Sequence, residues 1–97
     1  MTGDAHSSEG LESRRRKLLF RAWHRGMREL DLIMGRFADS AIAQMTADEL
    51  TEFERLMEVP DRELLAWVLG EMQARAHFDT ALFRRLCDFN RSGAGAR

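Results

Sequence analysis

Apolar residues recur at helical spacing along most of this 97-residue chain. The clearest apolar seam consists of Met27, Leu30, Met34, Phe37 and Ala41. Its members lie three and four residues apart, which is typical of one face of an amphipathic helix. The seam predicts a helix over residues 27–41, and Gly35, which lies off the seam, would allow a second helix to pack closely.

The segment before this seam is basic. Leu18 and Trp23 belong to the apolar side of a predicted helix over residues 12–24, and arginines and a lysine surround them. Gly26 follows, and glycine inside a helix costs about 1 kcal/mol relative to alanine. We therefore expect a break or a sharp bend at Gly26.

Three further helices are predicted from their start and stop signals. Thr46 and Glu49 have the spacing of a capping box, so a helix starts there and runs to about residue 58. Pro60 disfavours helical backbone at the residue before it, and a fourth helix starts at 60 or 61 and stops near Gly70. Residues 71–77 either extend that helix or form a connector, and the last helix runs from 78 or 79 to 90.

Composition agrees with helices. The chain has one proline, no tyrosine and few β-branched residues. We expect an all-α fold, a compact small bundle of about five short helices in a single domain over residues 11–90. Residues 1–10 are polar and predict a disordered lead-in, and residues 91–97 predict a flexible tail.

Charge is distributed unevenly, although the net charge is only −1. Residues 12–36 carry eight Arg or Lys against three acids, and residues 37–63 carry two against eight. Such a dipole can steer a partner, or part of it can be cancelled inside the fold. A solvated helix face is the default interpretation of Arg14 to Lys17, ahead of a nucleic-acid-binding helix or a membrane-surface helix, for which the apolar side is too narrow.

The sequence shows no targeting or membrane segment. The first ten residues include acids and no arginine, and no apolar run follows them, unlike a secretory signal or transit peptide. No stretch approaches the roughly 20 apolar residues that span a bilayer. We therefore expect a cytoplasmic protein without membrane insertion.

Catalytic chemistry finds little support in the residues. His6, His24 and His77 are scattered and lack the spacing of a helical metal site, and no phosphate-binding loop or nucleophile elbow is present. Cys87 permits no internal disulfide, and beside the last apolar face it is best interpreted as a half-buried inert thiol. The sequence predicts no enzyme, no metal site and no stably bound cofactor.

Charge also gathers around Gly26. From residue chemistry alone, the favoured interpretation is that Arg25 with Glu29, and Arg28 with Asp31, form weak local ion pairs of no more than about 0.3 kcal/mol. If Gly26 breaks the helix, the first pair no longer shares one face. The two acids then fall in the first turns of the second helix, where the helix dipole favours them.

The same stretch, Arg25-Gly26-Met27-Arg28-Glu29-Leu30-Asp31, resembles the Arg-Gly-x-x-Glu signature of the SdhE family, the FAD assembly factors of succinate dehydrogenase. The resemblance extends from about residue 15 to residue 90. It includes the spacing to the helix start at 46–49, the turn at 56–61 and the aromatic Trp67. Residues 73–78 depart from the family pattern.

The resemblance implies a small helical protein that is not an enzyme. It would bind the flavoprotein subunit of succinate dehydrogenase or of the related fumarate reductase and promote covalent attachment of FAD, which belongs to that partner. Gly26 would let the partner approach the backbone closely, and the charged residues would make charge-assisted contacts. The partner-binding residues implied are Arg25, Gly26 and Glu29 by direct match, with Met27, Arg28 and Asp31 beside them.

Two other classes of function stay open. One is a nucleic-acid-binding module that uses Arg14 to Lys17, which the acidic middle and the lack of a base-reading motif disfavour. The other is a helical adaptor that uses its apolar seam as a partner-helix surface. We expect no nucleic-acid partner and a monomer when the protein is free.

Overall fold

The computed structural model describes residues 3–93, and their side chains from residue 10 onward. This part of the chain is all-α, as predicted, with no strand. Two 3-10 turns accompany the helices: η1 (Ile42–Gln44) and η2 (Ala76–Phe78). The α-helices are α1 (Gly3–Trp23), α2 (Arg28–Ala41), α3 (Ala47–Met57), α4 (Asp61–Leu69) and α5 (Ala81–Arg91).

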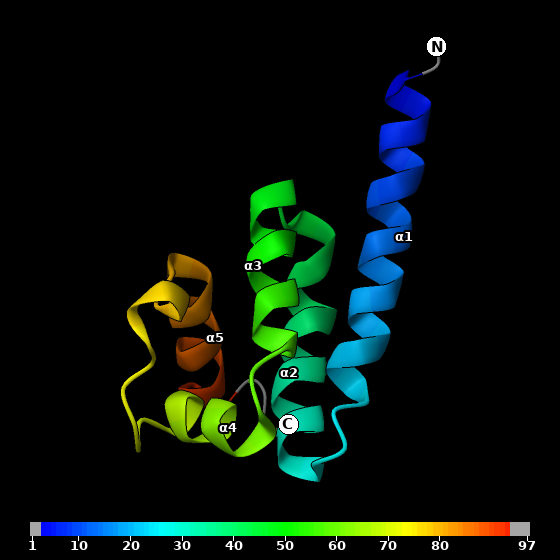
Figure 1. Cartoon of the computed structure of the whole chain (residues 1–97). Coiled ribbons are helices and arrows are strands. Elements are labelled where there is room, and N and C mark those ends of the chain that lie inside the picture. The colour runs from blue at the N-terminus through cyan, green and yellow to red at the C-terminus, as the bar shows by residue number, and fades with distance from the viewer. Residues whose placement is uncertain (1–2, 94–97) are drawn as a thin grey trace.

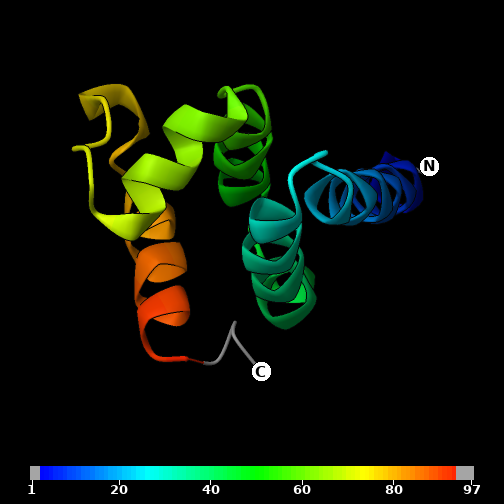
Figure 2. The same cartoon turned by 90° about the horizontal axis from the view of Figure 1, so that it is seen from below.

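The helices α1, α2 and α3 form one group and α4 and α5 form another, and the two groups share one core. The long helix α1 packs along α2 and also contacts α3, whereas α4 and α5 lie on the opposite side of α2 and α3 (Figure 1). The view from below separates α1 from α4 and α5 in the same way (Figure 2). The connection from α1 to α2 and the connection from α3 to α4 lie at the same end of the molecule, the lower end in Figure 1.

The core follows the apolar seams that the sequence shows. On α2, Leu30, Met34 and Phe37 are buried, as predicted. Phe37 lies edge-on to Phe53 of α3 and to Phe89 of α5, with ring centroids 6.0 and 5.5 Å apart. Aromatic contacts thus join α2 to both α3 and α5.

Close packing of α1 on α2 depends on Gly35. A Cβ atom added there would lie only 2.2 Å from Cδ2 of Trp23. The indole Nε1 of Trp23 also donates to the carboxylate of Asp39, at 3.2 Å. The expectation that Gly35 admits a neighbouring helix is confirmed.

The predicted start and stop signals hold in the middle of the chain. Thr46 and Glu49 make both hydrogen bonds of the capping box at the start of α3. Pro60 precedes α4, and Gly70 ends it in the left-handed conformation with φ +79°. α4 therefore does not continue past Gly70. Of the two alternatives for residues 71–77, the connector is confirmed, and it leads into η2.

The ends of the chain differ from expectation. α1 begins at Gly3, so most of the segment predicted as a disordered lead-in is helical here. No proline interrupts it, and Gly10 alone does not end a helix. α5 begins at Ala81, two or three residues later than predicted, because Thr80 caps it by accepting from the backbone N–H of Phe83 at 3.1 Å. α5 includes Arg91, and residues 94–97 of the predicted tail lie outside the described part of the chain.

Candidate functional site

The predicted break at Gly26 is a turn between α1 and α2. Gly26 has φ +96°, a conformation that side chains rarely adopt, and no atom lies within 4 Å of the position where a Cβ would stand. The backbone is therefore open to solvent there. Glycine is required at this position by the conformation of the turn and not by a lack of space.

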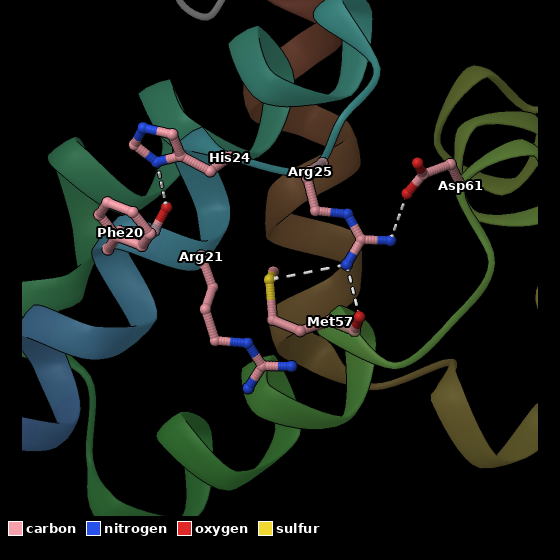
Figure 3. Close-up of a pocket in the computed structure, with 6 residues that line it drawn as sticks. All are labelled: Phe20, Arg21, His24, Arg25, Met57 and Asp61. Atoms are coloured by element: carbon pink, nitrogen blue, oxygen red, sulfur yellow. Dashed lines mark hydrogen bonds and ion pairs between the residues drawn. The ribbon is translucent and has the colours of Figure 1, made fainter.

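Arg25 points from this turn into the protein. Its guanidinium donates to the carbonyl oxygens of Met57 and Val59, at 2.5 and 2.7 Å, and pairs with the carboxylate of Asp61 at 2.7 Å. The Arg25 side chain is only 8% exposed. Figure 3 shows it extending between Met57 and Asp61. A partner could bind this guanidinium only by breaking contacts inside the chain.

Asp31 also stabilises the turn between α1 and α2. Its carboxylate accepts the backbone N–H of Arg25 at 2.5 Å, across the break between the two helices. The local ion pairs considered from the sequence, Arg25 with Glu29 and Arg28 with Asp31, do not occur among the described residues. Both predicted pairs were wrong. The first is absent because Arg25 turns towards the loop between α3 and α4, and in place of the second the carboxylate of Asp31 accepts the backbone N–H of Arg25.

The remaining signature residues face outward. Gly26, Arg28 and Glu29 are exposed, while Met27 is half-buried and packs against the core. Within residues 10–93, neither the side chain of Arg28 nor that of Glu29 has a hydrogen bond or an ion pair. The six residues predicted for the site therefore divide by role: Arg25 and Asp31 fix the turn from inside, and the exposed ones present a surface. We call Gly26, Arg28 and Glu29 the signature face.

A cavity of about 330 Å³ lies beside the turn. Helix α1 and the turn contribute four of its lining residues, and α3 and α4 contribute the other two (Figure 3). The lining residues are Phe20, Arg21, His24, Arg25, Met57 and Asp61. Its volume is at the low end of small-molecule sites, which span about 300–1,000 Å³.

Part of the charge dipole predicted from the sequence is cancelled where α1 meets α3. Arg14 pairs with Glu54 at 2.9 Å, and Arg21 pairs with Glu58 at 2.7 Å. The hydrogen bond from Arg14 lowers the pKa of Glu54, against the opposing effect of burial. Together with these two ion pairs, the pair of Arg25 and Asp61 connects the α1 side of the protein to α4.

The same contacts bear on the nucleic-acid hypothesis. Arg14 is held by Glu54, and Arg15 donates to the backbone oxygens of Ile42 and Met45, at 3.1 and 2.9 Å. Only Arg16 and Lys17 of the basic run are exposed and without a partner in the described part of the chain. Two free cations are a small electrostatic footprint for a phosphate backbone.

Histidines and the cysteine do not assemble into a site. Among the described residues, no group of three or more His, Cys, Asp or Glu side chains is placed to hold a metal ion. Cys87 is half-buried on α5, and burial raises the pKa of its thiol.

Among the described residues, no helix combines the length and the hydrophobicity that a membrane span requires.

The sequence interpretation missed two features of this region. The partners of Arg25 lie 32 to 36 residues away, which no local spacing indicates. Phe20 was not assigned to either side of its helix, yet it is exposed and lines the cavity. Its signal was a large aromatic residue between cationic positions on the outward side of the helix.

The fold and this surface define a small helical protein with a fixed turn that displays a mixed-charge face. A family model described as the flavinator of succinate dehydrogenase matches residues 16–90, which is most of the chain. The chain therefore belongs to this family, as its signature indicated.

Curated relatives agree with the family model. The chain is 38% identical over 89 residues to the FAD assembly factor SdhE of Acetobacter pasteurianus, covering 92% of this chain and 82% of that protein. It is 32% identical over 74 residues to the mitochondrial succinate dehydrogenase assembly factor 2 of Dictyostelium discoideum, covering 76% of this chain. The match spans only 52% of that mitochondrial protein, whereas it covers most of the bacterial one.

Proposed function

We propose that this protein is an FAD assembly factor that binds the flavoprotein subunit of succinate dehydrogenase, or of the related fumarate reductase, and promotes its covalent flavinylation. Membership of the flavinator family supports the proposal. So does the name of the bacterial relative, whose match covers nearly all of this chain. The signature face of Gly26, Arg28 and Glu29 is the surface we assign to the partner.

One observation carries this assignment. The two Nη groups of Arg25 and the carboxylate of Asp31 are bonded inside the chain, and together they hold the turn so that Gly26 and Glu29 stay outside. A turn fixed in this way needs little ordering when it binds. Met27, half-buried beneath it, supports the face from the core side.

Such a factor would act without chemistry of its own. By holding the flavoprotein subunit in one conformation, it would keep FAD close to the acceptor histidine, and proximity would raise the rate of attachment. FAD would stay with the flavoprotein, and the factor would be neither an enzyme nor a stable holder of the cofactor. Action in the cytoplasm and a monomeric free state are parts of the same proposal.

Glu29→Arg is the sharpest test, because Glu29 is exposed and has no partner in the described part of the chain. The variant should fold normally and lose covalent flavin on the flavoprotein subunit, measured by in-gel flavin fluorescence in a strain that lacks the native factor. Glu71→Arg, the same change at an exposed acid after α4, should restore flavinylation fully. Full restoration by Glu29→Arg as well would contradict the assignment.

Gly26 allows a second, paired test. Gly26→Ala and Gly26→Arg both place a side chain at φ +96°, so both carry the same backbone strain, about 1–2 kcal/mol. Only the arginine would obstruct the approach of a partner. We expect Gly26→Arg to abolish flavinylation and Gly26→Ala to retain a substantial part of it. Equal loss in both variants would assign the effect to strain alone.

A further inference from the structure

Phe20 is an exposed aromatic residue on the outward side of α1. Three large hydrophobic residues are exposed in the described part of the chain, and Phe20 is the most exposed of them at 62%, against 53% for Met72 and 49% for Leu69. A single exposed hydrophobic residue is ordinary in itself. What distinguishes Phe20 is how its ring is held.

The ring of Phe20 stacks on the ring of His24, one helical turn further on. The ring centroids are 4.0 Å apart and the ring planes differ by 17°. His24 is held in turn by a hydrogen bond of 2.7 Å between its Nδ1 and the carbonyl oxygen of Phe20, in which Nδ1–H must be the donor. The pair is therefore ordered before any partner arrives, and an ordered aromatic surface binds at a low cost in side-chain entropy.

The aromatic pair is continuous with the turn that carries the signature. Phe20 and His24 line one side of the cavity, and Arg25 and Asp61 line the other (Figure 3). A partner seated on Gly26 would therefore have this pair beside it. Leu69, by contrast, is the last residue of α4, at the opposite end of that helix from Asp61, and Met72 follows it.

Two cationic side chains near Phe20 on α1, those of Arg16 and Lys17, are exposed to solvent. Arg14, Arg21 and Arg25 pair with acids of α3 and α4, so their charge is compensated within the chain. Arg16 and Lys17 are exposed and have no ion pair within residues 10–93. Arg16 and Phe20 of α1, and His24, which directly follows the last residue of α1, are spaced four residues apart and so lie on one side of this segment. We call Arg16, Lys17, Phe20 and His24 the outer face of α1.

We propose that the outer face of α1 is a second part of the docking surface, in which the Phe20–His24 pair fills an apolar pocket on the flavoprotein subunit and Arg16 and Lys17 meet acidic residues at the rim of that pocket. This inference rests on the proposed function, since it assigns the same partner. Buried aromatic anchors with a polar rim are the usual source of binding energy in such interfaces.

The test is a titration of the purified full-length chain against the isolated flavoprotein subunit. Phe20→Ala should weaken the Kd about tenfold or more, and Phe20→Trp should bind within about threefold of the unaltered chain. Leu69→Ala, which truncates a comparably exposed side chain elsewhere, should leave the Kd unchanged. Circular dichroism would verify that each variant remains helical.

The outcomes separate this inference from the proposed function. Normal binding by Phe20→Ala, together with lost binding by Glu29→Arg, would overturn the role of the outer face and leave the proposed function intact. An unaltered chain that did not bind the subunit at all would overturn both. Light scattering that showed a dimer of the free chain, dissociated by Phe20→Ala, would assign the face to a second copy and also overturn the inference.

Discussion

The guanidinium of Arg25 and the carboxylate of Asp61 form an ion pair of 2.7 Å although the two residues are 36 positions apart in the chain. Arg25 belongs to the turn between α1 and α2, and Asp61 is the first residue of α4. The same guanidinium donates to the carbonyl oxygens of Met57 and Val59, which end α3 and begin the following turn. One side chain therefore ties together the two connections at this end of the bundle.

Removing that side chain should destabilise the fold. Arg25→Ala would leave Asp61 and two carbonyl oxygens without their donor in a largely buried place, so we expect the free energy of unfolding to fall by about 3 kcal/mol. Arg28→Ala, at an exposed arginine of the same signature, should change it by less than about 0.5 kcal/mol. Urea denaturation followed by circular dichroism measures both. Similar small losses in the two variants would show that the Arg25 contacts contribute little.

Gly35 should be intolerant of even one methyl group. Gly35→Ala would place Cβ 2.2 Å from the Trp23 ring, and the indole must move for both to fit. We expect a loss of stability of about 1–3 kcal/mol by overpacking. Gly10→Ala is the matched control, since nothing lies within 4 Å of a Cβ there and alanine is the better helix former. Thermal melting should show opposite or clearly unequal shifts.

Glu54 should contribute to acid sensitivity. Its pKa in the folded chain is lowered from the ordinary 4.5, chiefly by the hydrogen bond from Arg14, so the unfolded chain binds more protons as the pH falls through this region. The contribution is fully present above pH 4.5 and is lost as the pH falls below it. Glu54→Gln should lower stability at neutral pH and reduce the loss between neutral pH and about pH 3. Urea midpoints at several pH values measure this, and an unchanged pH profile in the variant would exclude Glu54 as a source.

Cys87 should react slowly with thiol reagents. Burial raises its pKa, so less thiolate is present at neutral pH than for a free cysteine, and the half-buried sulfur is harder to reach. We expect modification by a chromogenic disulfide reagent to be slow in buffer and to become fast in denaturing urea. Equal rates in both conditions would show that the thiol is freely accessible in the folded chain.

The sequence predicted those parts of the fold that local signals determine. The capping box of Thr46, the left-handed Gly70 and the break at Gly26 each act through neighbouring residues, and all three are confirmed. The late start of α5 was missed because Thr80 caps without a glutamate three residues later, so the capping-box pattern was incomplete. Residue spacing was a sufficient guide to the number of α-helices in the described part of the chain, but not to the starts of α1 and α5.

The candidate site was less predictable for a physical reason. The signature supplied the residues but not their directions, because the direction of Arg25 depends on where the turn between α3 and α4 lies after folding. From residue spacing, an ion pair between Arg25 and Glu29 was expected. In the folded chain Arg25 instead contacts Met57, Val59 and Asp61. Which of the exposed residues touch a partner is a property of two molecules, and a single chain supports it only as a proposal.

The anchoring of Arg25 also has a consequence for motion. Surface turns usually open and close locally, at little free energy, without disturbing the core. Here the turn that carries Gly26 is bonded to the end of α3 and the start of α4, so it can open only by releasing contacts with the far half of the bundle. The backbone N–H of Arg25, which donates to Asp31, should therefore exchange hydrogen with the cooperativity of the core, and the signature face should remain in one conformation for as long as the bundle stays folded.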